Sequence, residues 1–224
     1  PALKHQPTVS PRLHDKSATP HTSHRQTHDQ WSRLYIRHAE YLKSSALNTL
    51  ICKTKEVSMC TGIRFTSADG TMYFGRNLDW STPFGERIVI TPKGYPLKQA
   101  FPEESAARPS EHAIIGMGIT YQGFPLYFDC GNDAGLAVAG LNFPGYAKYE
   151  DAPVRGKTNV AAYEFPAWVA ANFATVDEVE EALSTIAIVG KPVSDSLGVS
   201  LLHWIIGDAK RSIVIEYLPT GMQI

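Results

Sequence analysis

Apolar and polar residues alternate along much of the chain after residue 59, as they do in β-strands that bury one face. The first such stretch covers residues 60–66, and Asp69-Gly70 is a strong turn signal before a second strand at residues 71–74. These two strands are therefore predicted to form a hairpin. Four further strands are predicted, at residues 87–91, 113–119, 125–129 and 136–141.

Helical spacing of apolar residues replaces this alternation after residue 160. Residues 161–173 are predicted to form a helix, with Pro166 near its first turn, where proline is tolerated. The tetrapeptide Thr175-Val176-Asp177-Glu178 is a capping box, so a second helix should run from it to about Leu183. The other predicted elements are a hairpin with strands at residues 199–206 and 212–217, and a surface loop at residues 97–112. The pattern predicts one α+β domain, residues 60–224.

Charge and composition set the first 58 residues apart. Residues 1–59 carry 9 Lys and Arg against 4 Asp and Glu, whereas residues 60–224 carry 12 against 18. Residues 1–30 contain almost no aliphatic side chains, so they bury too little apolar surface to fold. A marginal helix is conceivable at residues 31–50. We expect residues 1–58 to be a disordered leader, translated in frame from upstream and not part of the working protein.

Composition also limits the partners and the cell compartment. The three cysteines (Cys52, Cys60 and Cys130) form neither a disulfide framework nor a CxxC zinc motif, and the histidines at positions 21–28 lack acidic or thiol partners. No cofactor or metal is therefore expected. The basic leader lacks the aromatic residues of a nucleic-acid site, and no run of about 18 apolar residues is present to cross a membrane. These features predict a soluble cytoplasmic protein that binds neither nucleic acid nor membrane.

The segment Met59-Cys60-Thr61-Gly62 is the first candidate for chemistry. If Met59 is removed, Cys60 carries both a thiol nucleophile and a free α-amine that can act as its base. The alternative is a buried structural cysteine. Arg76, Asp79 and Asn142 are the other candidates, although Arg76 and Asp79 could form a surface ion pair and Asn142 could cap a turn.

Three segments in this order resemble the choloylglycine hydrolase family. They are Met59-Cys60-Thr61-Gly62, Phe74-Gly75-Arg76-Asn77-Leu78-Asp79-Trp80 and Gly140-Leu141-Asn142-Phe143-Pro144. The resemblance covers residues 59–224, with bacterial conjugated bile acid hydrolases most similar and penicillin V acylases as near relatives. It implies the four-layer αββα sandwich of N-terminal nucleophile hydrolases, C-terminally incomplete in this chain.

The resemblance also implies a role for each candidate residue. Cys60 would attack the amide that joins a bile acid to glycine or taurine, with its own α-amine as the base. Arg76 would favour the thiolate, Asp79 would hold the α-amine, and Asn142 would contribute to the oxyanion site. An apolar steroid pocket would be lined by Leu78, Trp80, Phe84, Val193 and Leu197.

Two features of the chain depart from the family pattern. A complete member is about twice as long as residues 60–224 and is expected to be a homotetramer, so this chain would expose part of a core and be inactive as it stands. The leader would also block the α-amine of Cys60. A penicillin V or related acyl-amide acylase is the alternative enzyme. A non-catalytic truncated product with a polyanion-binding tail is the alternative of another class.

Overall fold

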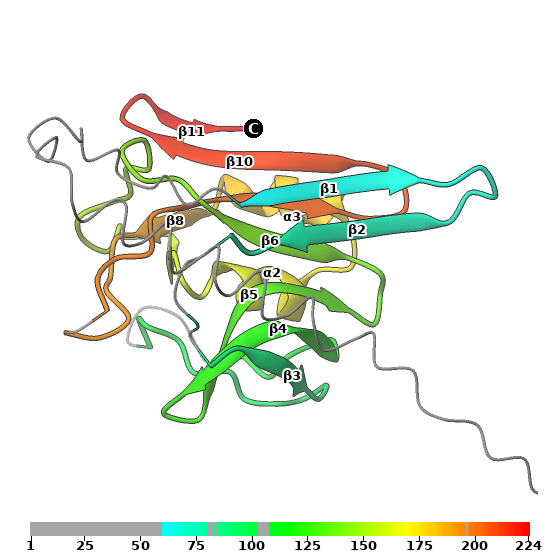
Figure 1. Cartoon of the computed structure of the whole chain (residues 1–224). Coiled ribbons are helices and arrows are strands. Elements are labelled where there is room, and N and C mark those ends of the chain that lie inside the picture. Colours follow the sequence, from blue (N-terminus) through cyan, green and yellow to red (C-terminus); the bar gives the residue numbers. More distant parts are fainter. Residues whose placement is uncertain (1–59, 80–82, 84, 103–107, 196) are drawn as a thin grey trace, which may run out of the picture. The chain divides into compact units, whose positions relative to one another are not determined.

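A seven-stranded antiparallel sheet is the largest element of the fold (Figure 1). The computed structural model describes residues 60–79, 83, 85–102, 108–195 and 197–224, which belong to a unit spanning Glu56–Ile224. The strands, in spatial order, are β11 (Gly221–Gln223), β10 (Ser212–Leu218), β9 (Leu202–Gly207), β6 (Ala137–Asn142), β5 (Phe124–Asn132), β4 (Ile114–Tyr121) and β3 (Arg87–Thr91). The predicted leader, its marginal helix and its histidine stretch lie outside the described residues.

Helices cover one face of this sheet and a β-hairpin lies on the other. The helices are α2 (Phe165–Asn172) and α3 (Val176–Leu183), and the hairpin consists of β1 (Thr61–Thr66) and β2 (Met72–Asn77). Side chains of a strand point alternately to the two faces. Val138 and Ile206 therefore join the main core beneath the helices. Neighbouring residues of the same strands point to the opposite face and form a smaller cluster under the hairpin: Ala139, Leu141 and Ile205, with Cys60 and Phe74 packed against them.

Local sequence signals mark the elements that the sequence predicted well. The β1–β2 turn contains Gly70 at a φ of 85°, a conformation that glycine adopts readily. In the capping box, the Thr175 hydroxyl accepts from the Glu178 backbone N–H at 3.3 Å, and the Glu178 carboxylate accepts from the Thr175 N–H at 3.3 Å. The α+β class and the first hairpin are confirmed.

The structure corrects the start of the first helix and adds three strands, of which β11 is the last in the chain. The predicted helix at residues 161–173 begins only at Phe165, because Ala161 ends a strand, β7 (Thr158–Ala161). This strand pairs in parallel with β8 (Ile186–Val189), which was also not predicted. Both runs have only four residues, too few to show a period. The strand expected from residue 199 begins at Leu202. No helix in the described part of the chain is long and apolar enough to cross a membrane.

Candidate active site

The first hairpin brings Cys60 and Arg76 together. Cys60 immediately precedes β1, and the register of the two strands pairs Thr61 with Asn77 and Gly62 with Arg76. The Asn77 side-chain oxygen accepts from the Thr61 N–H at 2.7 Å, which fixes the open end of the hairpin. The guanidinium Nη2 of Arg76 consequently lies 3.5 Å from the Sγ of Cys60, within reach of a weak hydrogen bond to sulfur.

The rest of the Arg76 side chain is anchored by the large sheet. Its Nη2 also donates to the backbone oxygen of Gly140 in β6 at 3.0 Å, and its Nη1 lies 3.8 Å from the Asp129 carboxylate in β5. Only 5% of the side chain is exposed, so the side chain of Arg76 is buried and does not lie on the surface. Nε and Nη1 are buried and have no hydrogen-bond acceptor among the described residues.

Asp129 is a charged residue of the site that the sequence reasoning missed. Burial raises the pKa of its carboxyl above the ordinary value, although the nearby Arg76 guanidinium acts in the opposite direction. The signal was present in the sequence, because Asp129 interrupts the otherwise apolar run Leu126-Tyr127-Phe128 before Cys130. A lone carboxylate in a buried strand needs a partner, and Arg76 supplies it.

A cavity of about 380 Å³ opens beside Cys60. Its lining includes six residues proposed from the sequence: Cys60, Arg76, Leu78, Asn142, Val193 and Leu197. Additional walls come from Tyr163 and from the continuous stretch at residues 197–202, which we call the wall segment. Most of the lining is apolar, so the cavity suits a bulky apolar group held against a thiol.

The remaining predicted site residues lie elsewhere or are not described. Asp79 is exposed two residues beyond the end of β2 and is not among the described residues that line the cavity. Trp80 and Phe84 fall outside the described residues, as does Cys52. The roles given to all these residues therefore stay predictions.

Cys130 differs from Cys60 in its surroundings. It lies in the main core at 5% exposure, and burial, assisted by the neighbouring Asp129 charge, raises the pKa of its thiol well above the ordinary value. A thiol held in this protonated state is unreactive. The environment of Cys130 is that of a buried structural cysteine.

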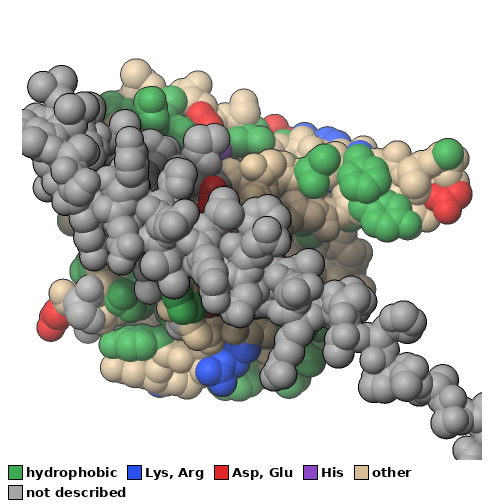
Figure 2. Space-filling view, viewed as in Figure 1, with side chains coloured by type: hydrophobic (Ala, Val, Ile, Leu, Met, Phe, Trp, Pro, Cys, Tyr) green, Lys and Arg blue, Asp and Glu red, His purple; other side chains and the backbone are tan. Residues whose placement is uncertain are grey.

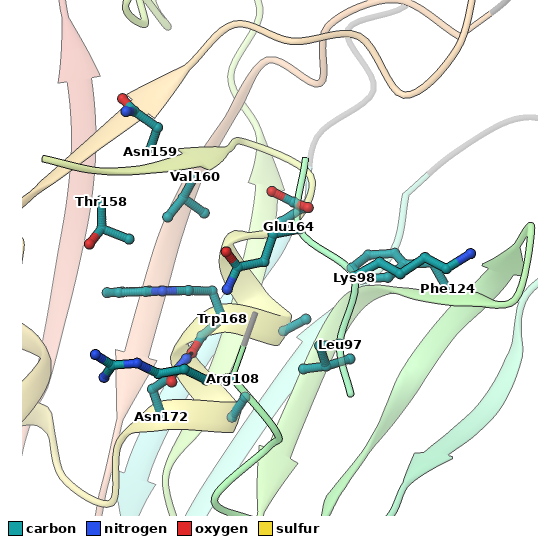
Figure 3. A pocket seen from close by; sticks show the side chains of 13 residues that line it. Leu97, Lys98, Arg108, Phe124, Thr158, Asn159, Val160, Glu164, Trp168 and Asn172 are labelled. Carbon is teal, nitrogen blue, oxygen red and sulfur yellow. Dashed lines mark hydrogen bonds between the residues drawn. The ribbon is translucent and has the colours of Figure 1, made fainter. Parts of the chain in front are cut away.

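A second, smaller cavity of about 30 Å³ lies at the start of α2 (Figure 3). Figure 3 shows Glu164 at the first turn of this helix, with Trp168 and Asn172 further along it. Glu164 accepts from the Ala161 N–H at 3.1 Å. Burial raises the pKa of Glu164 to about 7, although two backbone donors and the Lys191 charge oppose the shift. This cavity does not include Cys60.

Comparisons with known proteins agree with this fold. A profile of linear amide C–N hydrolases, the choloylglycine hydrolase family, matches residues 60–224. A bile salt hydrolase/transferase of Bifidobacterium longum subsp. longum is 53% identical over 166 residues, 74% of this chain and 51% of the relative. A conjugated bile acid hydrolase of Lactobacillus gasseri is 48% identical over 158 residues, 70% of this chain and 49% of the relative.

Solved structures show the same fold. A variant of the conjugated bile acid hydrolase from Clostridium perfringens superposes with a TM-score of 0.67 at 35% identity, over 72% of this chain and 49% of that one. Penicillin V acylase from Agrobacterium tumefaciens superposes with a TM-score of 0.57 at 22% identity, over 72% of this chain and 48% of that one. The predicted N-terminal nucleophile hydrolase fold is thereby confirmed.

Fold and sequence together define the class as that of the linear amide C–N hydrolases. The chain belongs to the choloylglycine hydrolase family of linear amide C–N hydrolases. It spans about half the length of the curated relatives that it matches.

Proposed function

We propose that this chain carries the nucleophile and part of the acyl-group pocket of a bile salt hydrolase. The observation that carries the proposal is the position of the Cys60 thiol, 3.5 Å from the Arg76 guanidinium and on the wall of a mainly apolar cavity. The names of the B. longum and L. gasseri relatives favour conjugated bile acids as substrates.

In the proposed reaction, the α-amine of Cys60 takes the proton of its own thiol, and the resulting thiolate attacks the carbonyl carbon of the amide. The tetrahedral intermediate places its negative charge on the carbonyl oxygen, where the Asn142 amide would donate a hydrogen bond. When the C–N bond breaks, the leaving glycine or taurine nitrogen takes a proton from the α-ammonium group of Cys60. Water then hydrolyses the resulting thioester, which releases the bile acid and restores the thiol.

The base in this scheme exists only if Cys60 is the first residue of the mature chain. Asp79 would then hold the α-amine, and the cation at Arg76 would stabilise the thiolate. The steroid would occupy the walls formed by Leu78, Val193 and Leu197, with Trp80 and Phe84 as further predicted contacts. Homotetramer formation, which the resemblance implies, and a cytoplasmic location, which the composition predicts, belong to the same proposal.

The test compares the chain that begins at Cys60 with its Cys60→Ser variant. Taurine release from taurodeoxycholate measures hydrolysis, and penicillin V is assayed in parallel. Protection of Cys60 from iodoacetamide by deoxycholate, followed by mass spectrometry of the Cys60 peptide, measures binding independently of turnover. Bile salt that is neither hydrolysed nor protective overturns the proposal. Faster cleavage of penicillin V would transfer the assignment to an acylase.

The name of the B. longum relative also includes acyl transfer. An amine that replaces water would attack the same Cys60 thioester and form a new amide. The same assay detects this reaction as a new bile acid conjugate when a second amino acid is added.

A further inference from the structure

The wall segment (residues 197–202) has few anchors of its own. At one end, Leu197 and Ser194 exchange backbone hydrogen bonds of 3.2 and 3.3 Å. At the other end, the Leu201 oxygen accepts from the Phe143 N–H at 2.8 Å, and β9 begins at Leu202. The residues between these ends line the Cys60 cavity, so whatever fixes them sets its width.

The hydroxyl group of Tyr149 contacts this segment at three points. It accepts from the Leu202 N–H at 2.6 Å and lies 2.7 Å from the Leu202 oxygen and 3.1 Å from the Ser200 oxygen. A phenol hydroxyl can accept a hydrogen bond and also donate its one hydrogen. The Tyr149 hydroxyl therefore accepts from the Leu202 N–H while its hydrogen points toward the two carbonyl oxygens. Tyr149 is only 6% exposed, which shields these bonds from water.

The position of Tyr149 explains why the strand end needs this hydroxyl. The ladder between β9 and β10 ends at the pair Trp204 and Ile215, and two further steps would set Leu202 opposite Tyr217. Instead, the Tyr217 oxygen accepts from the Lys148 N–H at 2.8 Å. Leu202 pairs with Asn142 of β6 on its other side. The chain at residues 148–149 therefore takes the place of the β10 partner that Leu202 lacks.

The segment that carries Tyr149 is itself held firmly. Besides the bond from Lys148 to β10, the Glu150 N–H donates to the Ile188 oxygen of β8 at 3.0 Å. The Tyr149 ring packs against Trp204, with 6.0 Å between the ring centroids. A rotamer fixed by packing makes the hydroxyl a rigid support for the cavity wall.

We infer that Tyr149 is a positioning residue that sets the width of the Cys60 cavity and so its selectivity for bulky, rigid apolar acyl groups. The inference rests on the proposed function, because it concerns the acyl-group pocket of that site. Tyr149 touches the substrate at no point in this scheme. It acts through Ser200 and Leu202, which line the cavity.

The variant Tyr149→Phe keeps the ring and removes the hydroxyl. Alkylation of Cys60 by iodoacetamide, a small reagent, is expected to change less than about twofold, because the thiol and Arg76 stay in place. Protection of Cys60 by deoxycholate should weaken about three- to tenfold, since the wall loses its anchor. Protection by phenoxyacetate, a smaller acid, should weaken less.

Tyr217→Phe is the matched control, because it removes the hydroxyl of another buried tyrosine beside Trp204 and away from the cavity. Its deoxycholate protection should equal that of the unmodified chain. Equal protection in Tyr149→Phe overturns the inference alone. An unmodified chain in which bile salt is neither hydrolysed nor protective overturns the proposed function.

A second measurement decides the matter if Tyr149→Phe does not fold. In the unmodified chain, the Leu202 amide should exchange its hydrogen as slowly as the amides within β9, because it donates to a buried hydroxyl. Exchange as fast as that of an exposed loop amide would show that Tyr149 does not hold the wall, and the inference would fail.

Discussion

At the scale of single residues, Arg76 joins three parts of the chain at one guanidinium. Nη2 contacts both the thiol of Cys60 and the backbone oxygen of Gly140, whereas Nη1 faces the carboxylate of Asp129. A lysine carries the same charge but offers no rigid fork of donors. Charge and geometry at this position can therefore be separated by substitution.

We expect Arg76→Leu to slow alkylation of Cys60 at neutral pH by about tenfold, because the thiolate loses its neighbouring cation. Arg76→Lys should recover part of this rate. The rate is measured with iodoacetamide and mass spectrometry of the Cys60 peptide. Arg87→Leu, at an exposed position at the start of β3, is the control and should leave the rate unchanged. Unchanged alkylation in Arg76→Leu would contradict the contact.

Buried Glu164 is expected to make the stability of the fold decrease as pH rises. Its pKa is raised to about 7 in the folded chain, whereas an unfolded chain titrates near the ordinary value of 4.5. Between these values the folded state holds a proton that the unfolded state has lost, so stability falls as pH rises through this window. Above pH 7 the loss of unfolding free energy, relative to its value below pH 4.5, is constant at about 3 kcal/mol or less.

Glu164→Gln should therefore raise the unfolding free energy at pH 8 and flatten its slope between pH 5 and 7. Urea denaturation at several pH values measures both. Glu181→Gln, which neutralises an exposed glutamate on α3, should leave the slope unchanged. A slope that persists in Glu164→Gln would assign the pH dependence to another group.

At the scale of elements, the hairpin rests directly on β9. A Cβ atom built on Gly62 would lie 2.7 Å from the Cγ2 of Ile205, which is closer than side chains pack. Gly75, on the partner strand, has more room, because its nearest neighbour would be the Cγ2 of Ile63 at 3.6 Å. Two glycines of one hairpin thus differ in what they tolerate.

We expect Gly62→Ala to lower the unfolding free energy by about 1–3 kcal/mol, because β1 must lift off the sheet. Gly75→Ala should cost less than about 1 kcal/mol. Thermal denaturation followed by circular dichroism compares the two variants. Equal costs would show that the hairpin is not held at this distance from β9.

Elements with a strong local signal were predictable, and those defined by distant partners were not. The capping box at Thr175 and the turn at Gly70 depend on a few adjacent residues. The parallel pair β7–β8 depends on a crossover through both helices, and its short strands show no period. Cys60 and Arg76 were candidates in the sequence itself, and the resemblance implied their roles. The partners of Asp129 and Tyr149 lie at distances along the chain that no local pattern encodes.

At the scale of the whole described unit, apolar surface remains uncovered on the hairpin side of the sheet. Ile88 and Ile90 of β3 are each 67% exposed, and Ile115, which pairs with Ile90, is 54% exposed. Figure 2 shows a further group of apolar side chains on the exposed face of the β1–β2 hairpin, where Phe65 and Tyr73 stack at 5.2 Å. Clusters of this kind promote association.

The chain is therefore expected to self-associate at micromolar concentration. The double substitution Ile88→Thr and Ile90→Thr should reduce the apparent mass measured by light scattering after gel filtration, because both side chains leave the apolar cluster. Ile224→Thr removes an exposed isoleucine elsewhere and should have little effect. A monomeric unmodified chain would contradict this prediction.

The hairpin next to Cys60 also affects the order in which the contacts of Arg76 form during folding. Cys60 and Arg76 are separated by 16 residues, whereas the contact of Arg76 with Gly140 spans 64. Hairpins form within about 1–10 μs, and contacts between distant strands follow more slowly. The Cys60 thiol therefore comes close to the Arg76 guanidinium before the walls of the cavity have formed. Until the sheet closes, the Cys60 thiol is open to oxidants and electrophiles in solution.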